Sequence, residues 1–240
     1  MRTFSFTPGQ ISENAGSGSA WHSFVRRREF EIVMSLLPSA TRFSSALELG
    51  AGDGGQSEVI APHCGHLTCT ELLENNEAVG RFRARNLPNV TYELCDARDL
   101  SKFPDRSFDF IFSSNMLEHV EGVQRCLVEC RRVLRSGGLM VHTMPSSDWK
   151  LWNTVVSLAM KRQRPPIHGT STSHVAEFLD FGVSRWRGEF RRAGFDVFQV
   201  AGLPFYFGHG PNPRKLLLLG NRLGWKSSVA YFCRLSEAVI

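Results

Sequence analysis

The chain has 240 residues, of which 42% are hydrophobic and 21% charged. This balance is typical of a globular protein and excludes disordered, collagen-like and coiled-coil chains. No apolar run approaches the ~18 residues of a membrane span, and the first residues lack the apolar core of a secretory signal. The six cysteines include no C-x-x-C pair, so we expect reduced thiols and a cytoplasmic protein.

The formal net charge is +5, from 28 basic and 23 acidic residues. A positive balance permits an anionic partner but does not identify one. The longest basic run has three residues and no RNA-binding appendage is recognisable, so we expect no nucleic-acid partner. The length suits one large α/β domain, and we treat residues 1–240 as a single domain.

The expected elements follow a flexible, polar, Gly- and Ser-rich arm over residues 1–19. Apolar residues at helical spacing predict an N-terminal helix over residues 20–37, which Pro38 ends. Short apolar runs then predict strands at Ser45–Leu49, Leu67–Thr70, Val90–Leu94, Phe108–Phe112, Leu139–Thr143 and Asp196–Val200, and a weaker signal marks a last strand near Val229–Cys233. The stretches between them predict helices at Gln56–Ala61, Asn75–Asn86, Glu121–Arg135 and Ser184–Ala193.

This alternation of strands and helices favours an α/β fold with a doubly wound, mainly parallel sheet and helices on both faces. Two segments break the rhythm. Pro145–Phe181 is marked by Trp, Pro and His residues, and Leu203–Lys226 is the second. We interpret both as insertions above the sheet.

The most informative run is ALELGAGDGG at residues 46–55, where a buried strand ends in a Gly-rich turn that leads into a helix. Glycines there permit positive φ angles and a close approach of a ligand, and the helix N-terminus offers unpaired N–H groups. Gly50, Gly52 and Gly55 match the G-x-G-x-x-G dinucleotide fingerprint. A tight strand–helix turn that binds no ligand is the alternative.

Three carboxylates lie in register with this turn. Glu71 closes the second strand, 21 residues after Gly50, where it can accept hydrogen bonds from both hydroxyls of a ribose. Asp96 follows the third strand, where it can accept from an adenine amino group. Glu48 lies inside the first strand, and a buried carboxylate needs a partner such as a ligand ammonium or the N–H groups of the turn. Each could be a solvated strand-end residue, but together they favour a nucleoside ligand.

In order and spacing, these segments resemble the class I S-adenosylmethionine-dependent methyltransferases. The resemblance covers residues 46–145 and rests on ALELGAGDGG, LTCTELLEN, LCDARDL, FPDRSFDFIFSSNMLEHV and ECRRVLRSGGLMVHTMP. It implies a Rossmann-like, seven-stranded, mainly parallel sheet whose last strand is antiparallel. Ser136 stands where the family often has Pro, which is a loop preference, and the seventh strand is poorly marked.

The resemblance also implies S-adenosylmethionine as the cofactor. Glu48 and the backbone of the turn would face its methionine half, and Glu71 would hold its ribose hydroxyls. Leu72, Asp96 and Ala97 would address the adenine. Asn115 and Met116 would lie near the reactive sulfonium. The full expected set is Glu48, Gly50, Ala51, Gly52, Asp53, Gly54, Glu71, Leu72, Asp96, Ala97, Asn115 and Met116.

Methyl transfer from a sulfonium requires alignment above all, and a general base is useful only for an acceptor such as a hydroxyl. His119 in NMLEHV is the candidate base, and a histidine that only packs at a helix start is the alternative. His168 and His174 could reach over the cofactor as part of a lid. His142 is expected in the core, and His209 lies in a loop whose aromatic residues could shape an acceptor pocket.

One group of histidines and cysteines is a candidate metal site. His63, Cys64, His66 and Cys69 lie within seven residues and superficially suggest zinc. Cys69 falls inside a predicted strand, and the spacing does not match the usual zinc pattern. We therefore assign no metal site.

The sequence defines the methyl acceptor less well than the cofactor. Residues 113–116 read SSNM, unlike the N-P-P-[YF] block of methyltransferases that act on adenine or glutamine amino groups. We expect a small-molecule, sugar or lipid-linked acceptor methylated at oxygen, with residues 45–145 as the cofactor-binding half and 146–240 as the acceptor-side half. Residues 214–225 could touch a membrane as an amphipathic element, or pack on the sheet or a dimer surface. An NAD(P)-dependent oxidoreductase and a non-catalytic cofactor-binding relative are the alternative functions, and no oligomeric state is predicted.

Overall fold

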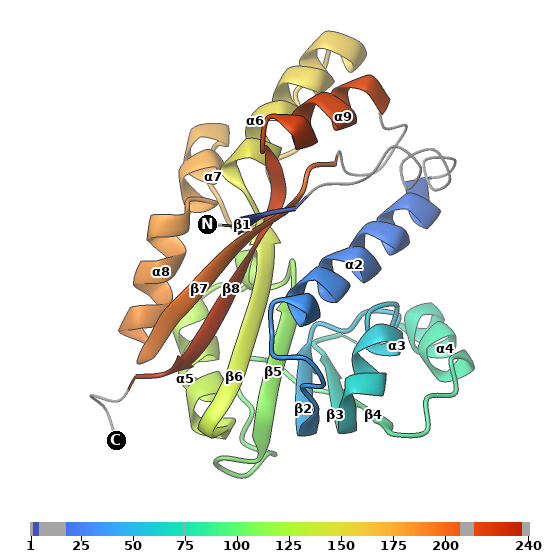
Figure 1. Ribbon diagram of the computed structural model, residues 1–240, viewed down its shortest axis with the longest axis vertical. Coiled ribbons are helices and arrows are strands. Elements are labelled where there is room, and N and C mark those ends of the chain that lie inside the picture. The colour runs from blue at the N-terminus through green and yellow to red at the C-terminus, as the bar shows by residue number, and fades with distance from the viewer. Residues whose placement is uncertain (1, 5–17, 74, 207–213, 237–240) are drawn as a thin grey trace.

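The computed structural model describes residues 2–4, 18–73, 75–206 and 214–236 (Figure 1). Eight strands within these ranges form one sheet in the spatial order β1-β7-β8-β6-β5-β2-β3-β4. They are β1 Arg2–Thr3, β2 Phe43–Leu49, β3 Cys64–Glu71, β4 Val90–Leu94, β5 Phe108–Ser114, β6 Leu134–Pro145, β7 Phe195–Pro204 and β8 Lys226–Leu235. Strand β8 is antiparallel to its neighbours β6 and β7, and the other pairs are parallel. The Rossmann-like sheet with an antiparallel last strand is thus confirmed, and β1 adds an edge strand.

The helices lie on both faces of the sheet (Figure 1). They are α2 Gly18–Ser35, α3 Ser57–Ile60, α4 Asn76–Ala84, α5 Val123–Val133, α6 Ser147–Val156, α7 His174–Asp180, α8 Val183–Arg192 and α9 Arg214–Arg222, with short turns η1 Ala61–His63 and η2 Leu117–His119 and a π-helical turn η3 Ser157–Lys161. Helices α2, α3 and α4 contribute to one core and helices α5 and α8 to the other.

Side chains at successive positions of a strand point alternately into the two hydrophobic cores. Ile111 of β5 belongs to the core with α5 and α8, while its neighbours Phe110 and Phe112 belong to the core with α2 and α3. In the same way Met140 and Val141 of β6 lie on opposite faces. Successive strand side chains point to opposite faces, so a strand that is apolar at every position has to be covered on both sides.

Two details of the chain differ from the sequence expectation. Arg2 and Thr3, inside the expected flexible arm, pair with Ala201 and Gly202 at the edge of the sheet. The helix expected to run to Arg135 ends at Val133, because the next residue already belongs to β6 and pairs with β5. The tertiary pairing outweighs the local signal in both places, since each strand residue gains backbone hydrogen bonds in the ladder.

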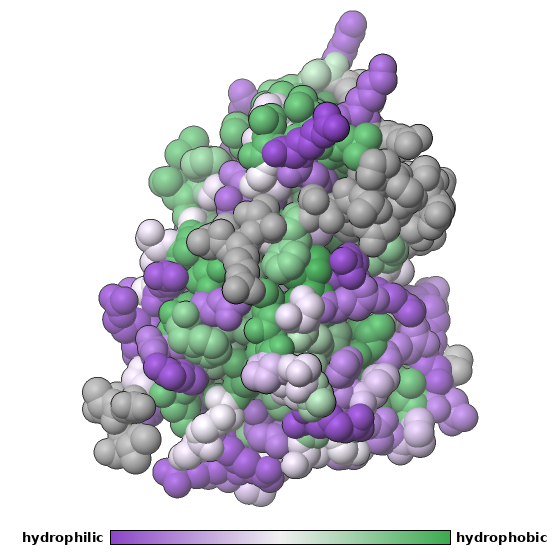
Figure 2. Space-filling model, viewed as in Figure 1, coloured by the Kyte–Doolittle hydropathy of each residue, from purple (hydrophilic) through white to green (hydrophobic). Residues whose placement is uncertain are grey.

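The segments expected as insertions form the upper part of the molecule in Figure 1, where α6, α7 and α9 rise above the carboxyl ends of the strands. Leu217 of α9 is fully buried in a small apolar cluster with Trp21 and Val25 of α2. The rings of Trp152 and Trp225 stack with centroids 3.9 Å apart. Helix α9 therefore packs one face against α2, while Lys215 and Leu219 on it are exposed. Figure 2 shows polar and apolar side chains together on the surface over α6 and α9. Within the described ranges, no helix is both long and apolar enough to span a membrane.

Candidate active site

The glycine turn, residues 50–55, lies where β2 ends and the chain leads to α3. Gly50, Gly52 and Gly54 have φ angles of +72°, +55° and +77°, a region that side chains other than glycine seldom adopt. The N–H groups of Gly50 and Ala51 donate to the carbonyl oxygen of Thr70 at 2.9 and 3.0 Å. These bonds hold the turn against the end of β3, the neighbouring strand.

Glu71, the last residue of β3, ties the turn more tightly. Its Oε2 accepts from the N–H of Gly52 at 3.0 Å, and its Oε1 accepts from the N–H of Leu72 at 2.9 Å. A carboxylate has about four acceptor positions, so this one can still accept from ligand hydroxyls. Leu72 is 54% exposed, and its side chain offers an apolar surface beside the carboxylate.

A cavity of about 360 Å³ opens on one side of the glycine turn. Its lining includes the four residues expected around a nucleoside, Glu71, Leu72, Asp96 and Ala97. Gly50 and Met116, which were expected beside the methionine half and the sulfonium, line the same cavity. A Cβ at position 50 would lie 2.7 Å from Cγ of Met116. Glycine at this position therefore lets Met116 pack under the turn as part of the cavity wall.

Asp96 in this smaller cavity has a partner that the sequence did not indicate. The guanidinium of Arg98 donates to both carboxylate oxygens of Asp96 at 2.7–3.0 Å, and the Arg98 N–H donates to Oδ1 at 2.8 Å. Hydrogen bonds from Arg98 hold the pKa of Asp96 below its ordinary value. The side chain is therefore an oriented, charged acceptor.

A larger cavity of about 660 Å³ opens on the other side of the turn. Ala51, Gly52, Asp53 and Asn115 line it, together with residues of α2, α6 and the segment after η3. Within the described residues, a Cβ at position 52 would meet no atom within 4 Å, so the backbone of Gly52 faces open space. Oδ1 of Asn115 is buried and has no hydrogen-bond partner among the described residues, which leaves an acceptor for a ligand donor.

Glu48 is placed beneath the turn and is not among the residues lining either cavity. Its side chain is buried, and Oε2 accepts from Oγ of Ser57 at 2.5 Å and from Sγ of Cys69 at 3.2 Å. Burial raises the pKa of Glu48. In this structure the carboxylate joins β2 to the first residue of α3, so it supports the turn from below.

The histidines separate into different roles. His119 borders the smaller cavity and is half-exposed, and burial lowers its pKa. His168 lines the larger cavity. The Nδ1 atom of His174 instead lies 2.9 Å from Nζ of buried Lys150. His142 is fully buried in the core, as expected, and His209 lies outside the described residues.

The cluster considered for zinc does not come together. Sγ of Cys69 donates to Glu48, while Sγ of Cys64 donates to the carbonyl oxygen of Ile60 at 3.4 Å. His66 is exposed and its Nε2 is 3.1 Å from Oγ1 of Thr91. Because the strand sends these side chains to different partners, they cannot converge on one ion.

Two residues of the larger cavity were not expected from the sequence. Arg26 of α2 donates from Nη2 to the hydroxyl of Tyr206 at 2.8 Å and from Nη1 to Glu29 at 2.6 Å. Burial raises the pKa of Tyr206 to about 12, so this hydroxyl keeps its proton at neutral pH. The arginine run at 26–28 gave no sign that its first member turns inward.

The residues that line the two cavities suit the two ends of S-adenosylmethionine, and the glycine turn lies between them. On one side, Glu71, Leu72 and Asp96 offer a carboxylate for hydroxyls, an apolar surface and a second acceptor. On the other side, Gly52 leaves its backbone open and Asn115 leaves a buried oxygen without a partner. A nucleoside on one side and a charged amino-acid end on the other fit this donor set.

Comparison with known proteins agrees with this arrangement. Residues 47–142 match the family model described as "Methyltransferase domain". The demethylmenaquinone methyltransferase of Tropheryma whipplei is 29% identical over 119 residues, which are 50% of this chain and 49% of that protein. The ubiquinone biosynthesis O-methyltransferase of Coxiella burnetii is 29% identical over 107 residues, 44% of this chain and 45% of that protein. The chain thus spans about half the length of these relatives.

Solved structures share the fold over most of the chain. An S-adenosylmethionine-dependent methyltransferase from Mesorhizobium loti aligns with a TM-score of 0.60 at 19% identity, over 86% of this chain and 97% of that one. The [4+2]-cyclase SpnF has the same TM-score of 0.60 at 16% identity, over 88% of this chain and 80% of that one, so the fold alone does not fix the reaction. The family model and the sheet order agree, and residues 47–142 form a methyltransferase domain.

Proposed function

We propose that this protein transfers the methyl group of S-adenosylmethionine to an oxygen atom of a small-molecule, sugar or lipid-linked acceptor. The observation that carries the proposal is the pair of cavities that flank the glycine turn. The smaller cavity would hold the nucleoside, and the larger one the methionine end and the acceptor. Residues 45–145 would thus form the cofactor-binding half and residues 146–240 much of the acceptor side.

The residues that would hold the cofactor follow from the contacts at the turn. Glu71 would accept the ribose hydroxyls, Asp96 the adenine amino group, and Leu72 would pack on the ring. When bound, S-adenosylmethionine supplies a methyl group activated by its positively charged sulfur. Gly52 and Asn115 would keep the amino-acid end in place, so that the methyl group faces the larger cavity.

The larger cavity supports an acceptor that is partly apolar. Trp149, Pro165 and Pro166 line it beside polar groups such as Asn153. Apolar side chains of neighbouring segments are exposed to solvent, among them Leu158 at 46% and Ile167 at 41%. Exposed apolar surface near a cavity is typical of a binding region.

The relatives support the acceptor class. One is a demethylmenaquinone methyltransferase, and another is an O-methyltransferase of ubiquinone biosynthesis. Both relatives are named for small molecules, and the second is named as an O-methyltransferase. These relatives match about half of the chain, so the acceptor segments of this protein require their own test.

For a hydroxyl acceptor the protein has to remove a proton and hold the oxygen in line with the methyl carbon. His119, at the edge of the smaller cavity, is the candidate to accept that proton. Alignment itself contributes about 7–11 kcal/mol in well-oriented reactions, so the lining of the larger cavity would contribute most of the rate.

Calorimetry and isotope labelling test the proposal. We expect S-adenosylmethionine and S-adenosylhomocysteine to bind, and NAD⁺ and NADH not to bind. The protein is then incubated with methyl-labelled S-adenosylmethionine and with separate polar and lipid extracts, and mass spectrometry identifies labelled products. Binding of NADH alone would favour the oxidoreductase. Binding of S-adenosylmethionine without label in any product would favour a non-catalytic relative.

A further inference from the structure

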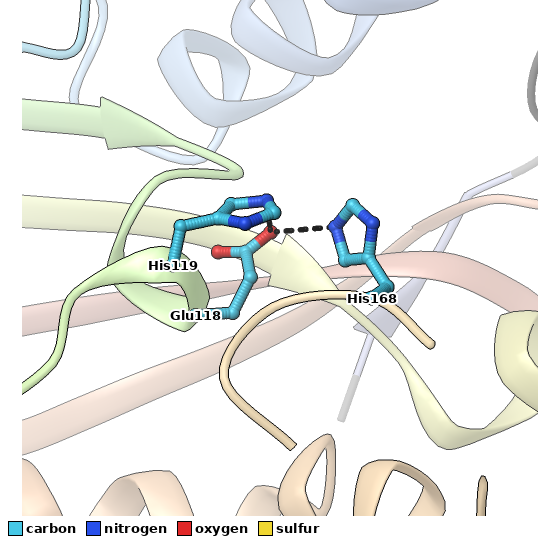
Figure 3. A group of neighbouring side chains, drawn as sticks. All are labelled: Glu118, His119 and His168. Carbon is cyan, nitrogen blue, oxygen red and sulfur yellow. Dashed lines mark ion pairs between the residues drawn. The ribbon is translucent and has the colours of Figure 1, made fainter. Parts of the chain in front are cut away.

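Glu118, His119 and His168 converge on one another (Figure 3), and His119 borders the smaller cavity while His168 lines the larger one. Glu118 and His119 belong to η2 after β5, whereas His168 comes from the segment before α7. One ligand atom from each side chain lies within 4.8 Å of the others. Figure 3 shows both imidazole rings turned toward the carboxylate.

The carboxylate of Glu118 lacks the partners that a buried charge requires. Its side chain is 2% exposed, and neither oxygen has a hydrogen-bond partner among the described residues. Nε2 of His168 lies 3.6 Å from Oε1, and Nε2 of His119 lies 4.0 Å from it. Nε2 of His168 is itself buried without a hydrogen-bond partner in the described chain. Such groups are stable in a protein interior when a cation or proton lies between them.

The positive charge of Arg26 lies near Glu118 but has other hydrogen-bond partners. Arg26 interacts electrostatically with Glu118, but its guanidinium donates to Glu29 and to Tyr206. The arginine therefore compensates Glu118 only at a distance. The carboxylate of Glu118 and the two imidazoles therefore remain as neighbouring groups that can bind a cation.

The backbone fixes His168 in this position. The N–H of Thr170 donates to the carbonyl oxygen of Glu118 at 3.0 Å. Gly169 has a φ angle of +71°, and a Cβ there would lie 2.5 Å from the same oxygen. Trp149 and Phe181 pack edge-on against the His168 ring at centroid distances of 5.6 and 6.1 Å. The segment thus approaches η2 closely and holds the imidazole beside the carboxylate.

We propose that Glu118, His119 and His168 bind one divalent cation. Two imidazoles and one carboxylate form a ligand set suited to Zn²⁺, Mn²⁺ or Fe²⁺, and three protein ligands leave coordination positions open. Because His119 borders the smaller cavity and His168 the larger one, the cation lies between the nucleoside and the acceptor.

The function of this cation rests on the proposed methyl transfer to oxygen. An acceptor hydroxyl that binds at an open position has its pKa lowered by the positive charge. The O–H bond breaks, the proton passes to a solvent water, and both electrons stay on the oxygen bound to the cation. His119 then acts as a ligand, and no histidine base is required.

Direct binding of Mn²⁺ and of Zn²⁺ to the chelator-treated protein tests the site. Electron paramagnetic resonance measures Mn²⁺, and calorimetry measures Zn²⁺. We expect one ion per chain, with affinity reduced about tenfold or more in Glu118→Gln, His119→Asn and His168→Asn. His119 is 48% exposed, so its variant remains informative even where the buried variants do not fold. His66→Asn removes an exposed histidine of β3 and is the matched control, with unchanged affinity.

Three results would overturn the cation site. These are no stoichiometric binding by the wild-type protein, equal affinity in the wild type and all three variants, and an equal loss in His66→Asn. Calorimetry with S-adenosylmethionine in the presence of chelator separates this inference from the proposed function. S-adenosylmethionine binding without cation binding contradicts the cation site alone, and the reverse contradicts the proposed function alone.

Discussion

The N–H of Gly52 donates to Oε2 of Glu71 at 3.0 Å, and this bond joins the glycine turn to the end of the neighbouring strand. The same carboxylate holds the N–H of Leu72 through its other oxygen. One side chain therefore shapes the turn and also presents acceptors to the smaller cavity.

Replacing Glu71 by Gln should weaken S-adenosylmethionine binding about 10- to 100-fold, because hydrogen bonds to a charged group contribute about 1.5–3 kcal/mol. Calorimetry measures the affinity. Glu77→Gln, at an exposed position of α4, is the matched control and should bind like the wild type. Equal affinities in both variants would remove Glu71 from the site.

Gly52→Val should abolish measurable cofactor binding while the protein still folds. The valine would project into the open space of the larger cavity, and φ of +55° strains any side chain by about 1–2 kcal/mol. Gly80→Val is the control, because position 80 also has open space but lies in α4 outside the cavities. A folded Gly52→Val variant that binds the cofactor normally would contradict the assigned site.

Asp96→Ala should weaken cofactor binding by about 1–2 kcal/mol, the contribution of one adenine hydrogen bond. The effect is smaller than at Glu71, because Asp96 has no bond to the glycine turn. Arg98 orients the Asp96 carboxylate, so Arg98→Met should weaken binding in the same direction but less. Titration of both variants with S-adenosylhomocysteine checks the order, and tighter binding in Asp96→Ala would refute it.

His142 should make the fold sensitive to acid. Burial lowers its pKa from 6.5 to about 3, so protonation favours the unfolded chain. The stabilisation is complete above pH 6.5 and falls as the pH is lowered toward 3, by up to about 1.4 kcal/mol per pH unit. Urea denaturation at pH 7 and pH 5 should show a smaller loss in His142→Asn than in the wild type. Equal losses would show that His142 does not contribute.

The buried pair of Lys150 and Glu177 should be important for stability. Their side chains are 3% and 0% exposed, and the pair joins α6 to α7. Glu177→Gln leaves the Lys150 charge without its partner and should reduce the free energy of unfolding by about 3–5 kcal/mol. Glu31→Gln, in the more exposed pair with Arg28, should cost less than about 1 kcal/mol. Similar values in urea denaturation would contradict the assignment.

The strands that carry the site were predictable because they are buried on both faces. Such strands contain runs of consecutive apolar residues, as in Phe110–Phe112 of β5, and the turns between them are marked by glycine and polar residues. Glu71 and Asp96 could be expected near each other because Glu71 ends β3 and Asp96 lies two residues after the neighbouring strand β4. The carboxyl ends of parallel strands meet at one edge of the sheet.

The sequence could not show which side chains outside the sheet turn toward that edge. Glu48 lies in the expected strand, yet its carboxylate supports α3 because Ser57 and Cys69 are its nearest partners. In the sequence, Arg98 and Arg26 cannot be distinguished from surface arginines. Only the structure shows that they donate to Asp96 and Tyr206.

The sequence by itself determined the sheet and the glycine turn and predicted the carboxylates beside that turn, because these depend on local periodicity and on the fixed edge of a parallel sheet. Tertiary structure alone decided the meeting of Glu118 and His119 with His168, which lies 49 residues further along the chain than His119. No local pattern encodes that distance. It is set by the hydrogen bond from Thr170 to Glu118 and by the close approach that Gly169 allows.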